Sequence, residues 1–226
     1  MIKIDISTIL IVKNEADRLA ILLPKLSDIF DEVLVINQDH HRSDNTLDIC
    51  KKNNVKHMQD NDWGFCEPSK NLGPFLAKHE WCLSIDADED LTPEFINWLQ
   101  TFDKSYDCYY IVRKNLPLID RPHNKPITFE HKLRLFKRGF VYCKPILHCD
   151  YEPRFDAKIG RIEFAALLHA KNYGEMEADK NRYEDLVNRY KNSPLIPQKW
   201  KDKIENDHNH KHRNYVRKYC KLDTIK

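Results

Sequence analysis

Short apolar runs alternate with stretches of helical spacing through the first 85 residues of the chain. Runs at 7–12, 33–36, 55–58 and 81–85 have the length and side chains of buried strands. Between the first two, Leu19, Leu22, Leu23, Leu26 and Ile29 recur at helical spacing. A helix from Ser43 to Asn53 and another from Pro68 to about Lys78 are expected in the later gaps. This order predicts a parallel sheet with right-handed crossovers.

The pattern changes after Asp90. A helix is expected at 92–102, a strand at 106–112, and a proline-rich loop or hairpin at 115–130. Residues 132–136 alternate between polar and apolar, as an antiparallel strand does. Further strands at 142–147 and 159–164 and a polar helix at 177–190 complete the prediction, which is an α/β fold with a smaller mixed region.

Four acids follow the apolar run 81–85 almost at once, namely Asp86, Asp88, Glu89 and Asp90. Open α/β sheets bind their ligands beyond the carboxyl ends of the strands. Asp86 and Asp88 are two residues apart, and two carboxylates this close repel each other unless a cation lies between them. Such oxygen ligands suit Mg²⁺ or Mn²⁺. The alternative interpretation is a solvated acidic loop before the helix that begins near Thr92.

Composition narrows the ways in which a phosphate could be bound. The chain has 226 residues, enough for a substantial core, but only five glycines, and it contains neither GxGxxG nor a Walker pattern. Phosphate binding would therefore need a metal and basic side chains. Seven cysteines include no CxxC pair, and no signal peptide or membrane-spanning run is recognised, so we expect reduced thiols and a cytoplasmic protein. Peripheral attachment to the inner face of a membrane is an alternative.

The charge is distributed unevenly. Residues 199–226 carry nine Lys and Arg against four Asp and Glu, whereas the rest of the chain is mildly acidic. With Trp200, Tyr215 and Tyr219 interleaved, this tail is expected to form an amphipathic, partly helical element that attracts an anionic acceptor. His208, His210 and His212 in the same tail are either a metal cluster or, more simply, solvated side chains.

Eight short motifs occur in an order that resembles family 2 glycosyltransferases, most nearly the small bacterial enzymes that build lipopolysaccharide core. They are residues 7–15, Ser43-Asp44-Asn45-Thr46, Lys70-Asn71, Asp86-Ala87-Asp88-Glu89, Leu133-Arg134-Leu135-Phe136, Leu147-His148, Leu168-His169 and Lys180-Asn181-Arg182-Tyr183. Together they cover roughly residues 6–190. No single motif is strong; their order and spacing carry the resemblance.

The resemblance implies the GT-A fold, in which a Rossmann-like half joins an acceptor half. On this basis residues 1–114 would bind a nucleotide sugar, 115–198 an acceptor, and 199–226 would be the basic tail. The implied activity is a metal-dependent, inverting transfer of a sugar (a hexosyl group) from a nucleotide diphosphate, most simply UDP. The acceptor would be a hydroxyl of a glycan, a lipid-linked glycan or another macromolecule, and the metal would be Mn²⁺ or Mg²⁺.

Site residues follow by position from the same resemblance. Those expected to contact the nucleotide sugar are Val12, Asn14, Glu15, Asn37, Asp39, Lys70, Asp86, Ala87 and Arg134. Those expected to bind the metal are Asp86, Asp88 and His169. The simpler interpretation of Lys70 is a solvated lysine on a helix, and that of His169 is a core histidine bonded to the backbone.

The chain departs from the family pattern at two places. Asn37 stands where an acid normally contacts the base, with Asp39 two residues later. Cys149 stands where an acid is expected directly after His148, and this acid would be the catalytic base. The proposed bases are therefore Asp150 first, Glu130 second and Glu152 third.

Two other functions remain open from the sequence. The acceptor could be DNA or a protein, which the motifs do not distinguish from a glycan. The chain could also be a non-catalytic nucleic-acid-binding module on a degenerate GT-A fold, as the basic, aromatic tail suggests. The acidic body weighs against the second alternative, and nothing in the sequence indicates the oligomeric state.

Overall fold

The computed structural model describes residues 3–39, 44–116, 127–145, 149–170 and 173–192. Most of these form one compact unit, whereas helix α5 (Tyr173–Asn192) is the described part of a second. Several predictions fall outside the described residues, including the helix start at Ser43, the motif residue His148 and the whole tail 199–226. The predicted boundaries at 114 and 198 stay a prediction.

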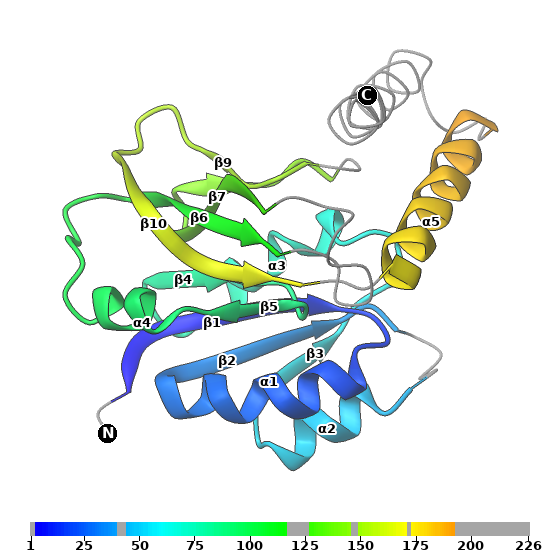
Figure 1. Ribbon diagram of the computed structural model, residues 1–226, viewed down its shortest axis with the longest axis horizontal. Helices are drawn as coiled ribbons and strands as arrows, with labels where there is room; N and C mark the ends of the chain where they lie inside the picture. Colours follow the sequence, from blue (N-terminus) through cyan, green and yellow to red (C-terminus); the bar gives the residue numbers. More distant parts are fainter. Residues whose placement is uncertain (1–2, 40–43, 117–126, 146–148, 171–172, 193–226) are drawn as a thin grey trace, which may run out of the picture. The chain divides into compact units, whose positions relative to one another are not determined.

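The predicted parallel strands form one half of an eight-stranded sheet with the order β3-β2-β1-β4-β7-β6-β10-β5. Strands β3 (Lys56–Gln59), β2 (Phe30–Asn37), β1 (Ile4–Val12) and β4 (Trp81–Ser84) all run in the same direction. Each lies within a few residues of its predicted bounds, and the expected parallel sheet is confirmed (Figure 1).

The other half of the sheet is mixed. Strand β7 (Thr128–Lys137) runs antiparallel to both β4 and β6 (Cys108–Asn115). Strand β10 (Ile159–His169) is parallel to β6, and the short edge strand β5 (Glu89–Leu91) is antiparallel to β10. The start of β7 and the ends of β6 and β10 therefore lie at the same edge of the sheet as the ends of β1, β2 and β4. Strands β8 (Val141–Tyr142) and β9 (Glu152–Pro153) form a separate pair.

Helices cover both faces of the parallel half. Because side chains alternate along a strand, Leu10 of β1 packs with Leu23 of α1 (Ala16–Ile29), whereas Ile9 packs on the opposite face with Leu76 of α3 (Leu72–Leu76). Helix α4 (Pro93–Leu99) adds Phe95 and Leu99 to the first cluster, and α2 (Thr46–Lys52) adds Cys50. Figure 1 shows α1 and α2 together beneath β1 and β2.

Three local predictions are corrected. The helix expected from Pro68 to about Lys78 is split into a 3-10 turn, η1 (Glu67–Ser69), and the five-residue α3. The strand expected at 142–147 extends only over β8 in the described residues. The acidic stretch was not expected to contain a strand, yet Glu89–Leu91 forms β5, because its backbone pairs with the end of β10.

Candidate functional site

The polar residues predicted to form a site gather at the carboxyl edge of the sheet. Gln38 N donates to Val12 O at 2.8 Å, which ties the end of β2 to the end of β1. Ile85 N donates to Ile9 O at 3.1 Å, so Asp86 and Asp88 begin beside the same strand. The alternation of strands and helices was sufficient to predict this convergence.

Asp86 is bound by arginine. Arg134 Nη2 lies 2.6 Å from Asp86 Oδ2 and Arg134 Nη1 lies 3.3 Å from Oδ1, so the pair is bidentate. Arg113 Nη1 approaches the same carboxylate at 3.7 Å. Burial opposes ionisation of Asp86, but the two arginines outweigh it and keep its pKa below the usual value. The cation that compensates Asp86 here is therefore a guanidinium.

Glu89 lies beneath Asp86 and is fully buried. Its Oε1 is 3.1 Å from Arg113 Nη1 and 3.5 Å from Arg134 Nη2, and its Oε2 accepts a hydrogen bond from Asp86 N at 2.9 Å. Burial raises the pKa of Glu89, and repulsion from Asp86 adds to the rise against the attraction of both arginines. Glu89 thus fixes the backbone of the acidic turn as well as the two arginines.

Asp88 faces His169 across the site. His169 Nε2 lies 3.1 Å from Asp88 Oδ2, and His169 Nδ1 lies 2.8 Å from Asn115 Oδ1. A carbonyl oxygen can only accept, so Nδ1 donates its proton to Asn115 and the ring orientation is fixed. A histidine that binds a metal commonly donates its other N–H in this way.

Asp150, the first candidate base, lies between two lysines. Lys132 Nζ is 3.0 Å from Asp150 Oδ2 and Lys70 Nζ is 3.5 Å from Oδ1. Burial raises the pKa of this carboxyl, but Lys132, Lys70 and Arg134 together bring it well below the usual range. Glu130, the second candidate, is 3.0 Å from Arg113 Nη2 and 3.6 Å from Lys132 Nζ, and these partners likewise outweigh burial and lower its pKa. The third, Glu152, pairs with Lys144 at 2.7 Å.

The Lys70-Asn71 pair attaches η1 and the start of α3 to the segment around Cys149. Lys70, nearly buried, donates from Nζ to Cys149 O at 2.8 Å. The Asn71 side chain makes two bonds to the backbone of Cys143, one to its carbonyl and one from its N–H. Lys70 is therefore not the solvated helical lysine of the simpler interpretation.

The turn after β1 is shaped by a left-handed residue and a distant cap. Asn14 has φ +58°, which asparagine tolerates better than most residues. Asp44 Oδ2 accepts from Ala16 N at 3.0 Å, and Thr46 Oγ1 accepts from Glu15 N at 3.1 Å. Asp44 and Thr46 thus cap the start of α1 and position the turn that carries Asn14 and Glu15.

The end of β2 is buried. Asn37, Gln38 and Asp39 are each less than 5% exposed. Asn37 Oδ1 accepts from Asp39 N at 3.3 Å, and Gln59 Nε2 donates to Asp39 O at 2.8 Å. Asn37 therefore shapes the turn that carries Asp39. Their roles in nucleotide binding stay a prediction.

Sequence reasoning missed four residues of this site, namely Glu89 as a buried partner, Arg113, Asn115 and Lys132. Arg113 and Asn115 follow the predicted strand 106–112, so its carboxyl end could have drawn attention to them. Lys132 was placed on a strand but given no role. The pairing of β7 with β6, which brings Glu130 opposite Arg113, was not derivable from local pattern.

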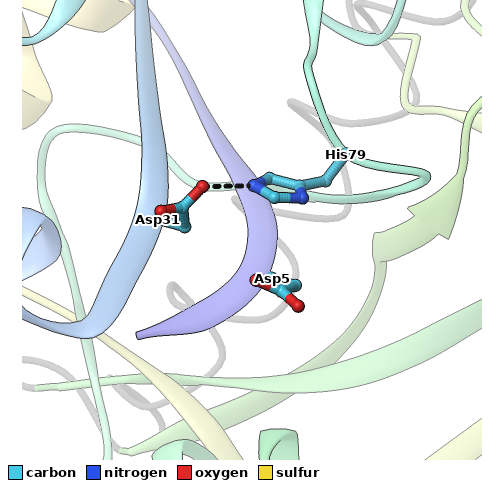
Figure 2. A group of neighbouring side chains, drawn as sticks. All are labelled: Asp5, Asp31 and His79. Carbon is cyan, nitrogen blue, oxygen red and sulfur yellow. Dashed lines mark hydrogen bonds and ion pairs between the residues drawn. The ribbon is translucent and has the colours of Figure 1, made fainter. Parts of the chain in front are cut away.

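A second cluster lies at the opposite, amino edge of the sheet. Asp5, Asp31 and His79 place one ligand atom each within 4.8 Å of one another, and Figure 2 shows His79 directed at Asp31 with Asp5 on the neighbouring strand. His79 Nε2 lies 2.9 Å from Asp31 Oδ2, and Lys78 Nζ lies 2.5 Å from the same oxygen. Lys78 already supplies positive charge there, so this cluster is not assigned to a metal.

Comparisons with known proteins give several relatives, although no protein-family profile matches the chain. An uncharacterized glycosyltransferase of Rickettsia conorii is 30% identical over 141 residues, which are 60% of this chain and 49% of that protein. One from Rickettsia prowazekii is also 30% identical, over 60% of this chain and 47% of its own length. The chain spans about half the length of the curated relatives it matches. The predicted resemblance to glycosyltransferases is confirmed by these relatives.

Among solved structures, the crystal structure of S. aureus TarS 1–349 matches with a TM-score of 0.54 at 17% identity. The match covers 100% of this chain and 76% of the TarS chain. The same fragment in complex with UDP gives a TM-score of 0.55, again at 17% identity, with 100% and 76% coverage. At this identity the likeness concerns the fold, and the predicted GT-A fold is confirmed. No helix in the described part of the chain has the length and apolar character needed to cross a membrane.

Proposed function

From the confirmed fold and the named relatives, we propose that the chain is a metal-dependent, inverting glycosyltransferase of the hexosyltransferase type. Its donor would be a nucleotide-diphosphate sugar, most simply a UDP-sugar. Its acceptor would be a hydroxyl of a glycan or lipid-linked glycan. The observation that carries the proposal is the pair Asp88–His169, fixed by Asn115 at the carboxyl edge of a GT-A sheet.

The residues of this pair fit a divalent cation. With Nδ1 donating to Asn115, Nε2 is the ring atom that a metal would bind, and the two side chains would then offer it one nitrogen and one carboxylate oxygen. A mixed nitrogen and oxygen set suits Mn²⁺ better than Mg²⁺, which prefers oxygen alone. When bound, the metal would neutralise the charge that develops on the leaving diphosphate.

Other residues have separate roles in the proposal. Asn14, Glu15, Asn37 and Asp39 surround the nucleoside, together with the backbone of Val12. Asp86, set by Arg134, contacts the ribose, with Ala87 beside it. Lys70 and Arg134 add positive charge for the diphosphate.

The transfer itself needs one proton acceptor. The acceptor oxygen forms a bond to the anomeric carbon as the bond from that carbon to the diphosphate oxygen breaks on the opposite face. Asp150 takes the hydroxyl proton, and Glu130 is the alternative. Inversion follows from this single displacement.

The proposal is tested by calorimetry of UDP binding with Mn²⁺, with Mg²⁺ and with EDTA, followed by a panel of nucleotide sugars. We expect tight binding only with metal. Asp88→Asn should reduce transfer by at least about two orders of magnitude, since it removes a charge near the leaving group. Asp90→Asn, which alters an exposed acid two residues away, is the matched control. Equal affinity for UDP in EDTA and in Mn²⁺ would contradict metal dependence.

A further inference from the structure

Trp63 lies in the loop 60–66 that follows β3, and its side chain is 46% exposed. The other tryptophans in the described residues are placed differently. Trp81 is buried, and Trp98 packs against Phe95, Phe102 and Tyr109. About half of the Trp63 indole therefore stays available for contact with a ligand, and burying it against one would be favourable.

The ring of Trp63 is fixed by a chain of polar contacts. Its Nε1 donates to Asp60 Oδ2 at 3.3 Å, and Ser69 Oγ donates to the same oxygen at 2.5 Å. Gln38 Nε2 in turn donates to Ser69 Oγ at 2.5 Å. Gln38 is buried between Asn37 and Asp39, so the orientation of the indole is tied to the end of β2.

The loop that carries Trp63 is also attached to the ends of both central strands. Asp60 N donates to Asn37 O at 2.9 Å, and Lys13 Nζ pairs with Asp62 Oδ2 at 2.8 Å. Gly64 has φ +79° and donates to Asp62 Oδ1 at 3.0 Å, which gives the tight turn on which the tryptophan stands. Trp63 therefore lies next to the residues that follow β1 and β2.

We propose that the indole face of Trp63 is the surface on which the base of the donor nucleotide stacks. This inference rests on the proposed function. The ends of β1 and β2 supply polar atoms for the edges of a base, but Val12-Lys13-Asn14-Glu15 and Asn37-Gln38-Asp39 contain no aromatic ring. Trp63 supplies one in a fixed orientation, and every base has a π-face to stack on it.

The distribution of contacts argues against an incidental surface residue. Phe75 and Phe155 are more exposed, at 81% and 98%, and neither has a polar group that could orient its ring. Trp63 has such a group, and it is engaged in a relay that reaches a buried residue of the site. The relay gives the indole N–H a defined partner and so restricts the ring, which lowers the entropy lost when a planar ligand stacks on it.

The test measures UDP and inorganic pyrophosphate binding by calorimetry, with Mn²⁺ present, for the wild type, Trp63→Ala and Trp63→Phe. We expect Trp63→Ala to weaken UDP roughly ten- to hundredfold and to leave pyrophosphate within about twofold, because only UDP carries a base. Trp63→Phe keeps a ring and should stay within about fivefold of the wild type. In the wild type, UDP should also change the tryptophan fluorescence, and this change should vanish in Trp63→Phe.

Each outcome separates the two proposals. If the wild type binds UDP and Trp63→Ala binds it equally well, the stacking inference is overturned while the proposed function stands. If the wild type binds no nucleotide, the proposed function fails. If Trp63→Ala does not fold, the fluorescence comparison decides, because a signal that persists in Trp63→Phe places the ligand away from Trp63. A loss shared equally by UDP and pyrophosphate would also overturn stacking.

Discussion

At the scale of single residues, the two candidate bases share one lysine. Lys132 contacts both Asp150 and Glu130, at 3.0 and 3.6 Å. Both carboxyls have lowered pKa values, so both are ionised at neutral pH and both are weaker bases than a free carboxylate. Asp150 is closer to Lys70, whose proposed role is at the diphosphate, and it therefore remains the first choice.

The pair Asp150→Asn and Glu130→Gln distinguishes the two bases. The true base should lose about two to four orders of magnitude in turnover, because the acceptor hydroxyl keeps its proton, while donor binding persists. Transfer and UDP binding are measured separately for each variant. A loss of less than roughly tenfold in both variants would mean that neither residue takes the proton.

The lowered pKa of Asp150 also determines how the transfer rate should depend on pH. A base must be ionised, so the rate falls only as the pH drops through its pKa, which here lies below the usual value of about 3.9. Lys132→Met removes the largest attraction that lowers this pKa and should move the acid limb upward. Lys104→Met, which changes an exposed lysine outside the site, should leave the limb in place.

At the scale of elements, α3 lies unusually close to β1. A Cβ built on Gly73 would be 2.4 Å from Ile9 Cγ2, a distance that real side chains do not adopt. Ile9 is fully buried in the central strand and has little room to move. Lys70 and Asn71 directly precede this short helix and bond to Cys149 and Cys143.

Gly73→Ala should therefore destabilise the fold. The added methyl group forces Ile9 or α3 to shift, at a cost of about 1–3 kcal/mol, which exceeds the gain in helix propensity. Urea denaturation measures the loss as a lower midpoint at unchanged slope. Phe75→Ala, an exposed change in the same helix, should alter stability by no more than about 0.5 kcal/mol. Equal stability of Gly73→Ala and the wild type would show that α3 can move freely away from β1.

The same elements show what the sequence could and could not predict. Strands β1, β2, β3 and β4 follow from local apolar pattern, and their parallel order follows from the helices between them. The division of the 68–78 segment was not predicted; within it Lys70 bonds to Cys149 and Asn71 to Cys143, and these partners are distant in sequence. Strand β5 was missed because three residues are too few to show an alternating pattern, and because its partner β10 lies far away in the sequence. Arg113 and Lys132 were missed for the same reason, since strand pairing gives them their partners.

At the scale of the whole molecule, charged side chains connect the two halves of the sheet. Asp86 belongs to the turn that leaves the parallel half and Glu89 to the edge strand β5, whereas Arg113, Glu130, Lys132 and Arg134 come from β6 and β7. Arg113 contacts Asp86, Glu89 and Glu130, at 3.7, 3.1 and 3.0 Å. The network sets the position of the acidic turn relative to the strands of the mixed half.

Glu89 is the most deeply buried member of this network, and its replacement tests how the network contributes to stability. Glu89→Ala leaves Arg113 and Arg134 with less compensation and should cost about 3–5 kcal/mol. Glu89→Gln keeps one side-chain oxygen, which can accept from Asp86 N or from Arg113 but not from both, and its NH₂ group then faces the other donor, so it should cost about 1–3 kcal/mol. Urea denaturation of both variants and of the wild type measures the difference. Equal losses in the two variants would show that an amide at this position compensates the arginines no better than a methyl group does.

The raised pKa of Glu89 determines how the difference in stability between the wild type and Glu89→Gln should change with pH. A carboxyl with a raised pKa in the folded state binds its proton more tightly there than in the unfolded chain, where the pKa is about 4.3. The resulting stability is fully present below that value and is lost as the pH rises through the folded pKa. Glutamine has no such proton, so the stability advantage of the wild type over Glu89→Gln should shrink as the pH rises. A gap that widened with pH would mean that the arginines outweigh burial and that the pKa of Glu89 is lower in the folded state than in the unfolded chain.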